Sequence, residues 1–139
     1  MGQVIAIHIS AEVSAPMRSL ERANILTDFG LEGDRKARPG SKRQVLIISA
    51  EILEEFGLQP GDVRENLTTR GIDIMALERG QRVRIGPVLL ETTVPCTPCD
   101  FMDSLRPGLQ EESRGRRGML FRVLEGGQVR VGDPVIVLD

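Results

Sequence analysis

The chain has 139 residues, of which 40% are hydrophobic and 27% charged, and its formal net charge is −2. These values are typical of one globular domain, and they give no overall attraction to nucleic acid or to an anionic membrane. No stretch approaches the ~20 apolar residues of a membrane span, and the N-terminal segment lacks the regions of a signal peptide. With only two cysteines, the sequence predicts a soluble cytoplasmic protein and a single domain over residues 1–139.

The first half of the chain contains three predicted strands and one predicted helix. Residues 3–10 alternate between apolar and polar, and a second short strand is predicted over 23–27. The apolar run 44–48 has the length of a strand that is buried on both faces. Ser49 is then predicted to cap a helix that ends at Gly57.

The second half continues as short strands. A turn of helix or a brief strand is predicted over 72–77, and short helices near 100–112. A short extended segment is predicted over 64–69, and strands are predicted over 82–85, 88–94, 119–124, 128–131 and 135–138. Two glycines between 119–124 and 128–131 predict that these two strands form a hairpin. Eight or so short strands with few helices favour a mainly β fold, namely a small closed or nearly closed β-barrel with short helices at its ends.

Both cysteines of the chain lie in one segment, Val94-Pro95-Cys96-Thr97-Pro98-Cys99. The prolines before each cysteine place the thiols in a rigid, non-helical loop. Asp100 is predicted to cap a short helix, so Cys99 would lie near the unpaired backbone N–H groups at the start of that helix. Cys99 is therefore the candidate reactive thiol, and Cys96 is expected to be less accessible.

Other polar residues leave several functions open. Arginines are concentrated near 35–43 and 114–117, and arginine binds phosphate and carboxylate groups well. The triplet Arg64-Glu65-Asn66 is either a salt-bridged loop or part of an anion site. His8 is the only other soft metal donor, so a zinc site is not favoured. Without Trp or Tyr the chain offers little surface for stacking bases, and nucleic acid is not an expected partner.

An ordered set of short motifs runs along nearly the whole chain. The main ones are Gly30-Leu31-Glu32-Gly33-Asp34-Arg35, Arg43-Gln44-Val45-Leu46, Gly61-Asp62-Val63-Arg64-Glu65-Asn66-Leu67-Thr68, Pro95-Cys96-Thr97-Pro98-Cys99 and Gly118-Met119-Leu120-Phe121-Arg122-Val123. Together they resemble the MOSC domain, the C-terminal module of molybdenum-cofactor sulfurases, which also occurs alone in bacteria. Each motif is weak by itself, but their order is specific.

The resemblance implies a β-barrel-rich fold and the molybdenum cofactor (molybdopterin) as ligand. It implies that Cys99 is the catalytic residue, which carries sulfur as a persulfide or ligates molybdenum. Arg64 and Asn66 would contact the anion and the pterin, and Gly33 and Asp34 would shape the rim of the site. The complete set of implied cofactor-binding residues is Gly33, Asp34, Arg35, Arg64, Glu65, Asn66 and Arg122.

Two features depart from the family pattern. Members often carry a histidine after Gly-Asp-Arg, and this chain has Lys36 there. The chain also lacks the pyridoxal-phosphate domain of full-length sulfurases, so no pyridoxal phosphate is expected.

Three functions follow from these observations. The first is a molybdenum-cofactor binding or sulfur-carrier module that uses Cys99, with a sulfur-donor or redox protein as its partner. The second is a thiol–disulfide or persulfide-handling protein that uses Cys96 and Cys99 without molybdenum. The third is a small barrel that binds RNA or a protein through its arginine loops.

Overall fold

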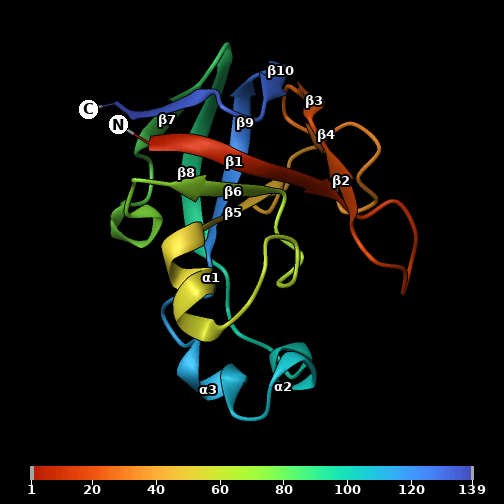
Figure 1. Ribbon diagram of the computed structural model, residues 1–139. Coiled ribbons are helices and arrows are strands. Elements are labelled where there is room, and N and C mark those ends of the chain that lie inside the picture. The colour runs from red at the N-terminus through yellow and green to blue at the C-terminus, as the bar shows by residue number, and fades with distance from the viewer. Residues whose placement is uncertain (1, 139) are drawn as a thin grey trace.

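The structure is a computed structural model, and residues 2–138 are described here. Seven strands pair in the order β11-β7-β8-β9-β5-β6-β1, and β11 pairs in turn with β1, which closes a barrel (Figure 1). Their bounds are β1 (Gly2–Ile9), β5 (Val45–Ser49), β6 (Leu67–Arg70), β7 (Arg82–Ile85), β8 (Val88–Pro95), β9 (Met119–Glu125) and β11 (Pro134–Val137). All pairs in the ring are antiparallel except β5–β6. The structure thus confirms the predicted β-barrel.

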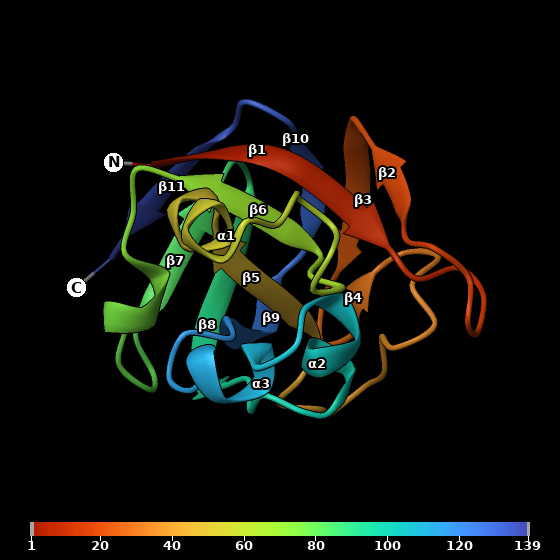
Figure 2. The ribbon, with the colours of Figure 1, turned by 60° about the horizontal axis from the view of Figure 1, so that its bottom comes forward.

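Shorter elements surround the barrel. Strand β2 (Arg18–Leu20) extends the sheet beside β1, and β10 (Gly127–Arg130), β3 (Arg22–Leu26) and β4 (Gly30–Leu31) form a separate three-stranded sheet. The helices are α1 (Ala50–Phe56), α2 (Phe101–Leu105) and α3 (Leu109–Glu112), with a 3-10 turn, η1 (Ile74–Ala76). Viewed from below, the three α-helices gather at one end of the barrel (Figure 2).

Alternation along β5 separates two hydrophobic clusters. Val45 and Ile47 point into the barrel and join its main core. Ile48 points outward into a second cluster with α1, α2 and α3, of which Leu53 and Met102 are fully buried members. Because successive side chains of a strand face opposite sides, this one strand supports both clusters and is buried on both faces, as the apolar run predicts.

The ends of the helices agree only in part with the ends predicted from the sequence. Gly57 ends α1 in the left-handed conformation, as predicted. Ser49 precedes α1, but its hydroxyl donates to the carbonyl of Ile72 rather than capping the helix. Asp100 precedes α2 without a side-chain cap hydrogen bond, so the predicted cap is wrong.

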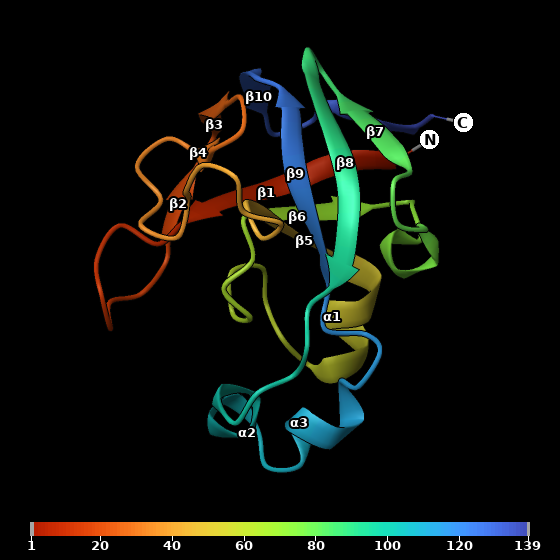
Figure 3. The ribbon, with the colours of Figure 1, turned by 180° about the vertical axis from the view of Figure 1, so that it is seen from behind.

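Two predicted strand features are also wrong. Strand β10 does not form a hairpin with β9 but pairs with β3, about a hundred residues earlier in the chain. The predicted extended segment 64–69 is shorter, because Arg64 adopts a left-handed backbone with φ 64° and β6 starts at Leu67. The view from behind shows β8 and β9 running together as two long strands, while β3 and β4 lie to one side (Figure 3).

Candidate functional site

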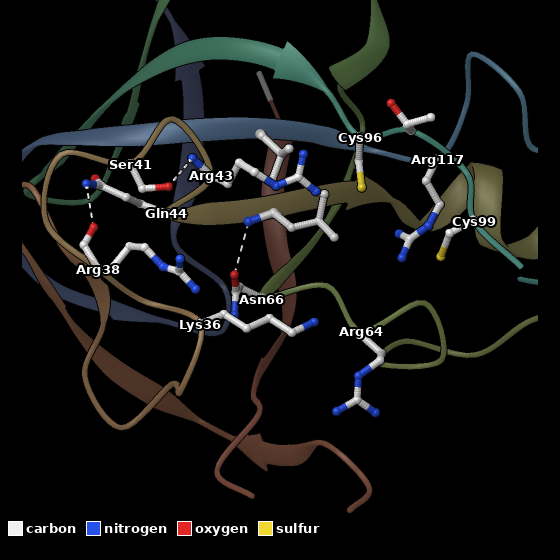
Figure 4. A pocket seen from close by; sticks show the side chains of 13 residues that line it. Lys36, Arg38, Ser41, Arg43, Gln44, Arg64, Asn66, Cys96, Cys99 and Arg117 are labelled. Atoms are coloured by element: carbon white, nitrogen blue, oxygen red, sulfur yellow. Dashed lines mark hydrogen bonds between the residues drawn. The ribbon is translucent and has the colours of Figure 1, made fainter. Parts of the chain in front are cut away.

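A cavity of about 430 Å³ lies on the outer face of the barrel, between the β4–β5 loop and the cysteine loop before α2 (Figure 4). Its floor is the cross-strand pair Leu46 and Leu120, which lie opposite each other on β5 and β9. Their neighbours Val45 and Phe121 fill the barrel interior. The remaining lining residues are Lys36, Arg38, Ser41, Arg43, Gln44, Arg64, Asn66, Cys96, Thr97, Cys99 and Arg117.

The lining is strongly cationic. It contains four arginines and one lysine and no carboxylate. In Figure 4, Arg117 lies with both cysteines on one side of the cavity, while Arg38 and Arg43 lie on the other. An apolar floor with convergent positive charges is the arrangement expected for an anionic ligand that also has a hydrophobic part.

Arg117 is the most unusual member of the lining. Its side chain is only 6% exposed, yet Nε and Nη1 have no hydrogen-bond partner among residues 2–138. Burying an unpaired charged group is costly. Such a group is therefore expected where a bound anion accepts hydrogen bonds from its free N–H groups. Arg117 cannot be singled out from the sequence, because nothing local distinguishes it from Arg114 and Arg116.

The other two arginines of that loop are engaged elsewhere. Arg114 pairs with Glu111 at 2.7 Å, and Arg116 pairs with Glu55 and stacks 4.8 Å from the ring centroid of Phe56. These contacts do not favour the arginine loop as a surface for RNA or for a protein partner.

Lys36 stands where many relatives of the resembled family carry histidine. Partial burial lowers the pKa of its ammonium group below the ordinary lysine value, and the positive charge of Arg64 lowers it further. Arg35 and Arg117 act in the same direction, whereas Asp34 raises the pKa. Lys36 therefore feels an excess of positive charge, as expected where cations converge on one site.

Arg64 is held by neutral acceptors. Its Nη2 donates to Ser10 Oγ at 3.1 Å, and both Nη atoms lie 3.4 Å from the carbonyl oxygen of Ala15. No carboxylate pairs with it within residues 2–138, which speaks against the salt-bridged loop. Its left-handed backbone costs about 1 kcal/mol or more, and such strain is found at functional sites.

Asn66 lines the cavity, but its side-chain amide is already engaged. Oδ1 accepts from Leu46 N at 3.0 Å, and Nδ2 donates to His8 O at 3.2 Å and to Asp34 Oδ2 at 2.9 Å. Asp34 Oδ1 in turn accepts from Ser10 N at 3.1 Å. Both Nδ2 protons are therefore used within the protein, and Asn66 holds the wall of the cavity in place. Asn66 therefore has a positioning role in this wall, and its contact with the ligand stays a prediction.

The two cysteines share the cavity but differ in access. Both are free thiols; Cys99 is exposed and Cys96 is buried at 7% exposure. Cys96 N donates to Gly118 O at 2.8 Å, which fixes this end of the loop against β9. Cys99 O accepts from Met102 N at 3.0 Å at the start of α2. The structure thus places the predicted reactive thiol at the solvent side of the cavity.

Five implied residues lie outside the lining, and one of them, Asp34, bonds to Asn66 and Ser10 as described above. Glu65 is fully buried, and its Oε2 accepts from Gly61 N and from Thr68 Oγ1. Arg122 pairs with Asp28 at 3.0 Å. Gly33 lies in the turn before Asp34, and Arg35 faces a neighbouring hollow. The sequence therefore located Arg64, Asn66 and Cys99 on one cavity, whereas Glu65 and Arg122 serve the surrounding framework.

Gln44 organises the opposite wall of the cavity. Its Nε2 donates to Asp28 Oδ1 and to Arg38 O, and its Oε1 accepts from Val123 N. The hydrogen bond from Gln44 is the main cause that lowers the pKa of the Asp28 carboxyl. Gln44 was part of a quoted motif, but its spatial role depends on contacts too distant in sequence to be read from the motif.

Within residues 2–138 no three His, Cys, Asp or Glu side chains cluster in a way that would hold a metal ion, so a metal at Cys99 would need further ligands from a bound group. No helix in this range is both long and apolar enough to cross a bilayer.

Comparisons with known proteins place this site in a family. The sequence model of the MOSC domain matches residues 34–136. The YUAD protein from Bacillus subtilis has a similar structure, with a TM-score of 0.80 and 20% identity over 97% of this chain and 94% of that one.

Two YiiM structures are similar as well. YiiM from Geobacillus stearothermophilus has a TM-score of 0.79 and 18% identity over 100% of this chain and 76% of that one, and YiiM from Escherichia coli has 0.69 and 23% over 99% and 70%. No curated protein sequence matches. The family match covers most of the chain, and the chain belongs to the MOSC domain family.

Proposed function

We propose that the cavity binds the molybdenum cofactor through its anionic pterin phosphate, and that Cys99 carries sulfur for it or ligates its molybdenum. MOSC membership supports a ligand of this class. The residues present fit such a group, because the cavity joins an apolar floor, five cations and one exposed thiol. When bound, the cofactor would supply the metal and its sulfur ligands, since residues 2–138 contain no cluster of three His, Cys, Asp or Glu side chains that could hold a metal ion.

One observation supports this function most strongly: the buried guanidinium of Arg117 has two nitrogen atoms that find no partner within residues 2–138. A phosphate accepts from arginine in a planar, two-point geometry. Lys36 and Arg64 add positive charge to the same cavity, so three segments of the chain contribute to holding one anion.

Cys99 has the access that sulfur transfer needs. A donor protein with a persulfide would transfer its outer sulfur to the Cys99 sulfur atom. The donor's S–S bond breaks, a new S–S bond forms on Cys99, and the donor leaves as a thiol. Arg117 on the same side of the cavity would orient an anionic acceptor toward that sulfur.

The test uses the whole chain expressed in a host that makes the molybdenum cofactor, followed by pterin and molybdenum analysis. We expect wild type to copurify with molybdopterin. The affinity of Arg117→Gln for it should be at least tenfold lower, the effect of one lost charge-assisted contact. Arg114→Gln is the matched control, because Arg114 is exposed in the same loop, and it should load normally. Cys99→Ser should retain pterin but lose sulfur or molybdenum. Absence of pterin from the wild-type protein would contradict the function.

A second candidate is thiol–disulfide exchange between Cys96 and Cys99. It is favoured by one observation, that both thiols line the same cavity. A disulfide-bearing partner would take up the two electrons and become a dithiol, while the two cysteines form a disulfide. Mass spectrometry after exposure to oxidised glutathione distinguishes this function, since it requires an intramolecular disulfide that forms without loss of the fold.

A further inference from the structure

A basic loop, residues 38–43, forms the wall of the cationic cavity that lies away from the cysteines (Figure 4). Three of its six residues are basic and none is acidic. Arg38 and Arg43 line the cavity, and neither they nor Lys42 form an ion pair within residues 2–138. Like charges repel each other, so the loop stays beside the ligand space only if other contacts hold it there.

Side chains outside the basic loop hold it by its backbone. The hydrogen bonds of this kind are Gln44 Nε2 to Arg38 O at 3.1 Å, Gly40 N to Asp28 Oδ1 at 3.2 Å, and Thr93 Oγ1 to Lys42 O. Because these bonds engage the backbone, the cationic side chains of the loop are left for a ligand. Among the three outside side chains, that of Asp28 is the charged one.

Asp28 is itself fixed to strand β9. Its backbone N donates to Val123 O at 2.9 Å, and Arg122 Nε donates to its Oδ1 at 3.0 Å. Gln44 Nε2 donates to the same oxygen at 3.0 Å. The backbone of Asp28 is left-handed with φ 49°, a conformation that aspartate and asparagine adopt more readily than most residues. Since β9 also carries Leu120 of the cavity floor, the Asp28 carboxylate connects the basic loop to that floor.

The charge of Asp28 has the wrong sign to attract an anion. The hydrogen bonds from Gln44 and Gly40 are the largest causes that lower the pKa of its carboxyl, so Asp28 is negatively charged at neutral pH. By Coulomb's law alone, a carboxylate near the cavity weakens the binding of an anion. A carboxylate is also a stronger acceptor of N–H groups than a neutral oxygen, so it holds the loop more firmly. The direct effect of the charge on binding and its effect through the loop therefore have opposite signs.

We propose that Asp28 is a positioning residue for anion binding. From outside the lining of the cavity, its carboxylate holds the basic loop so that Arg38 and Arg43 face the ligand space before a ligand binds. A loop that is already ordered avoids the entropic cost of ordering it on binding. The inference rests on the proposed function, because it requires an anion in this cavity.

The experiment measures the binding of inorganic phosphate to the whole chain by titration calorimetry at neutral pH. Asp28→Asn keeps the shape of the side chain and suits the left-handed backbone, so the variant should fold. We expect it to bind phosphate about fivefold more weakly, as the loss of charge-assisted hydrogen bonds allows, even though a repelling charge has been removed. Glu125→Gln is the matched control, because it removes the carboxylate of another exposed ion pair with an arginine. It should bind phosphate as tightly as wild type or slightly more tightly.

A double-mutant cycle tests whether Asp28 acts through the two arginines. In a protein that carries both Arg38→Gln and Arg43→Gln, the basic loop has no arginine left to position. Adding Asp28→Asn to this protein should no longer weaken phosphate binding, because only the direct effect of the charge remains. A merely structural role of Asp28 would lower the melting temperature in both backgrounds and leave the affinity of the folded protein unchanged.

The outcomes separate this inference from the proposed function. Unchanged or tighter phosphate binding by Asp28→Asn overturns the inference, and so does an equal loss with and without the two arginines. If Arg117→Gln weakens phosphate binding in that case, the proposed function stands without the positioning role. A wild-type protein that binds no phosphate would contradict the proposed function and the inference together.

Discussion

Asn66 donates a 2.9 Å hydrogen bond from Nδ2 to Asp34 Oδ2, which joins two motifs that are 32 residues apart. Asp34 also accepts a hydrogen bond from Ser10 N, through its Oδ1. Asn66 accepts one from Leu46 N in the cavity floor, through its own Oδ1. The two motifs are therefore related by structure. They hold the wall of the cavity, and the charged residues beside them, Lys36 and Arg64, face the ligand space.

Asn66→Ala should destabilise the ligand-free protein. The substitution leaves Leu46 N without a partner and removes the donor to both His8 O and Asp34 Oδ2. Buried polar groups left unpaired cost about 1–3 kcal/mol each, so we expect the free energy of unfolding to fall by about 3 kcal/mol, measured by urea denaturation. Asn24→Ala is the control, because within residues 2–138 its side chain bonds only to exposed Glu32, and it should cost under about 0.5 kcal/mol. Equal effects of the two variants would contradict the positioning role.

The reactivities of the two thiols should differ. Cys99 is exposed and Cys96 is buried, so iodoacetamide at neutral pH should modify Cys99 first, as peptide mapping by mass spectrometry can measure. Phosphate in the cavity should slow the labelling of Cys99. In denaturant both thiols should react at similar rates. Preferential labelling of Cys96 in the native protein would reverse the assignment.

Lys36 should make anion binding depend on pH. Its lowered pKa means that the cavity loses a positive charge at a lower pH than an ordinary lysine would allow. A bound anion favours the charged form and raises the pKa of Lys36 again, so phosphate affinity should fall as the pH rises through the lowered pKa, and binding should take up protons at and just above it. In Lys36→Gln this component of the pH dependence should vanish, while Lys42→Gln, the other lysine, should retain it. Calorimetry in buffers of different ionisation enthalpy measures the proton uptake.

The same shift has a consequence for stability. Folding disfavours the charged form of Lys36, so the unfolded chain binds more protons than the folded one between the lowered pKa and the ordinary lysine value of 10.5. In that alkaline window the ligand-free wild type should gain stability with rising pH relative to Lys36→Gln. Below the lowered pKa both states are protonated, and the difference between the two proteins should be constant.

The sequence predicted the barrel well because strand alternation is local. The apolar run that became β5, the helix ending at Gly57 and the loop of the two cysteines were all visible in short windows. The prediction that was wrong concerns strand pairing between segments that are far apart in the sequence. The glycines near 126 favoured a local hairpin, but β10 pairs with β3, because closing the barrel and the small sheet together stabilises that register.

The candidate site divides in the same way. Cys99 and Arg64 could be singled out from unusual local sequence, whereas Arg117 looks like any arginine of a glycine-rich loop until its burial is known. Asn66 lines the cavity, but its hydrogen bonds to His8 and Asp34 join residues far apart in the chain and could not be read from its motif. Burial and satisfaction of polar atoms are properties of the folded protein, and motif spacing does not contain them.

Arg117 should stabilise the fold of the ligand-bound protein and destabilise the fold of the ligand-free protein. Its Nε and Nη1 are buried without partners, and replacing such a group by an apolar side chain of similar length is neutral or stabilising, by up to about 4 kcal/mol. We therefore expect Arg117→Met to melt at the same temperature as wild type or higher without ligand, and to lose the stabilisation that phosphate gives to wild type.

Arg116→Met, one residue earlier, should show the opposite pattern. It loses the ion pair with Glu55 and the stacking on Phe56, so the ligand-free protein should melt lower while the phosphate shift persists. Thermal melts of the three proteins with and without phosphate give both readings. A lower melting temperature of ligand-free Arg117→Met together with an intact phosphate shift would show that Arg117 serves the fold and not the anion.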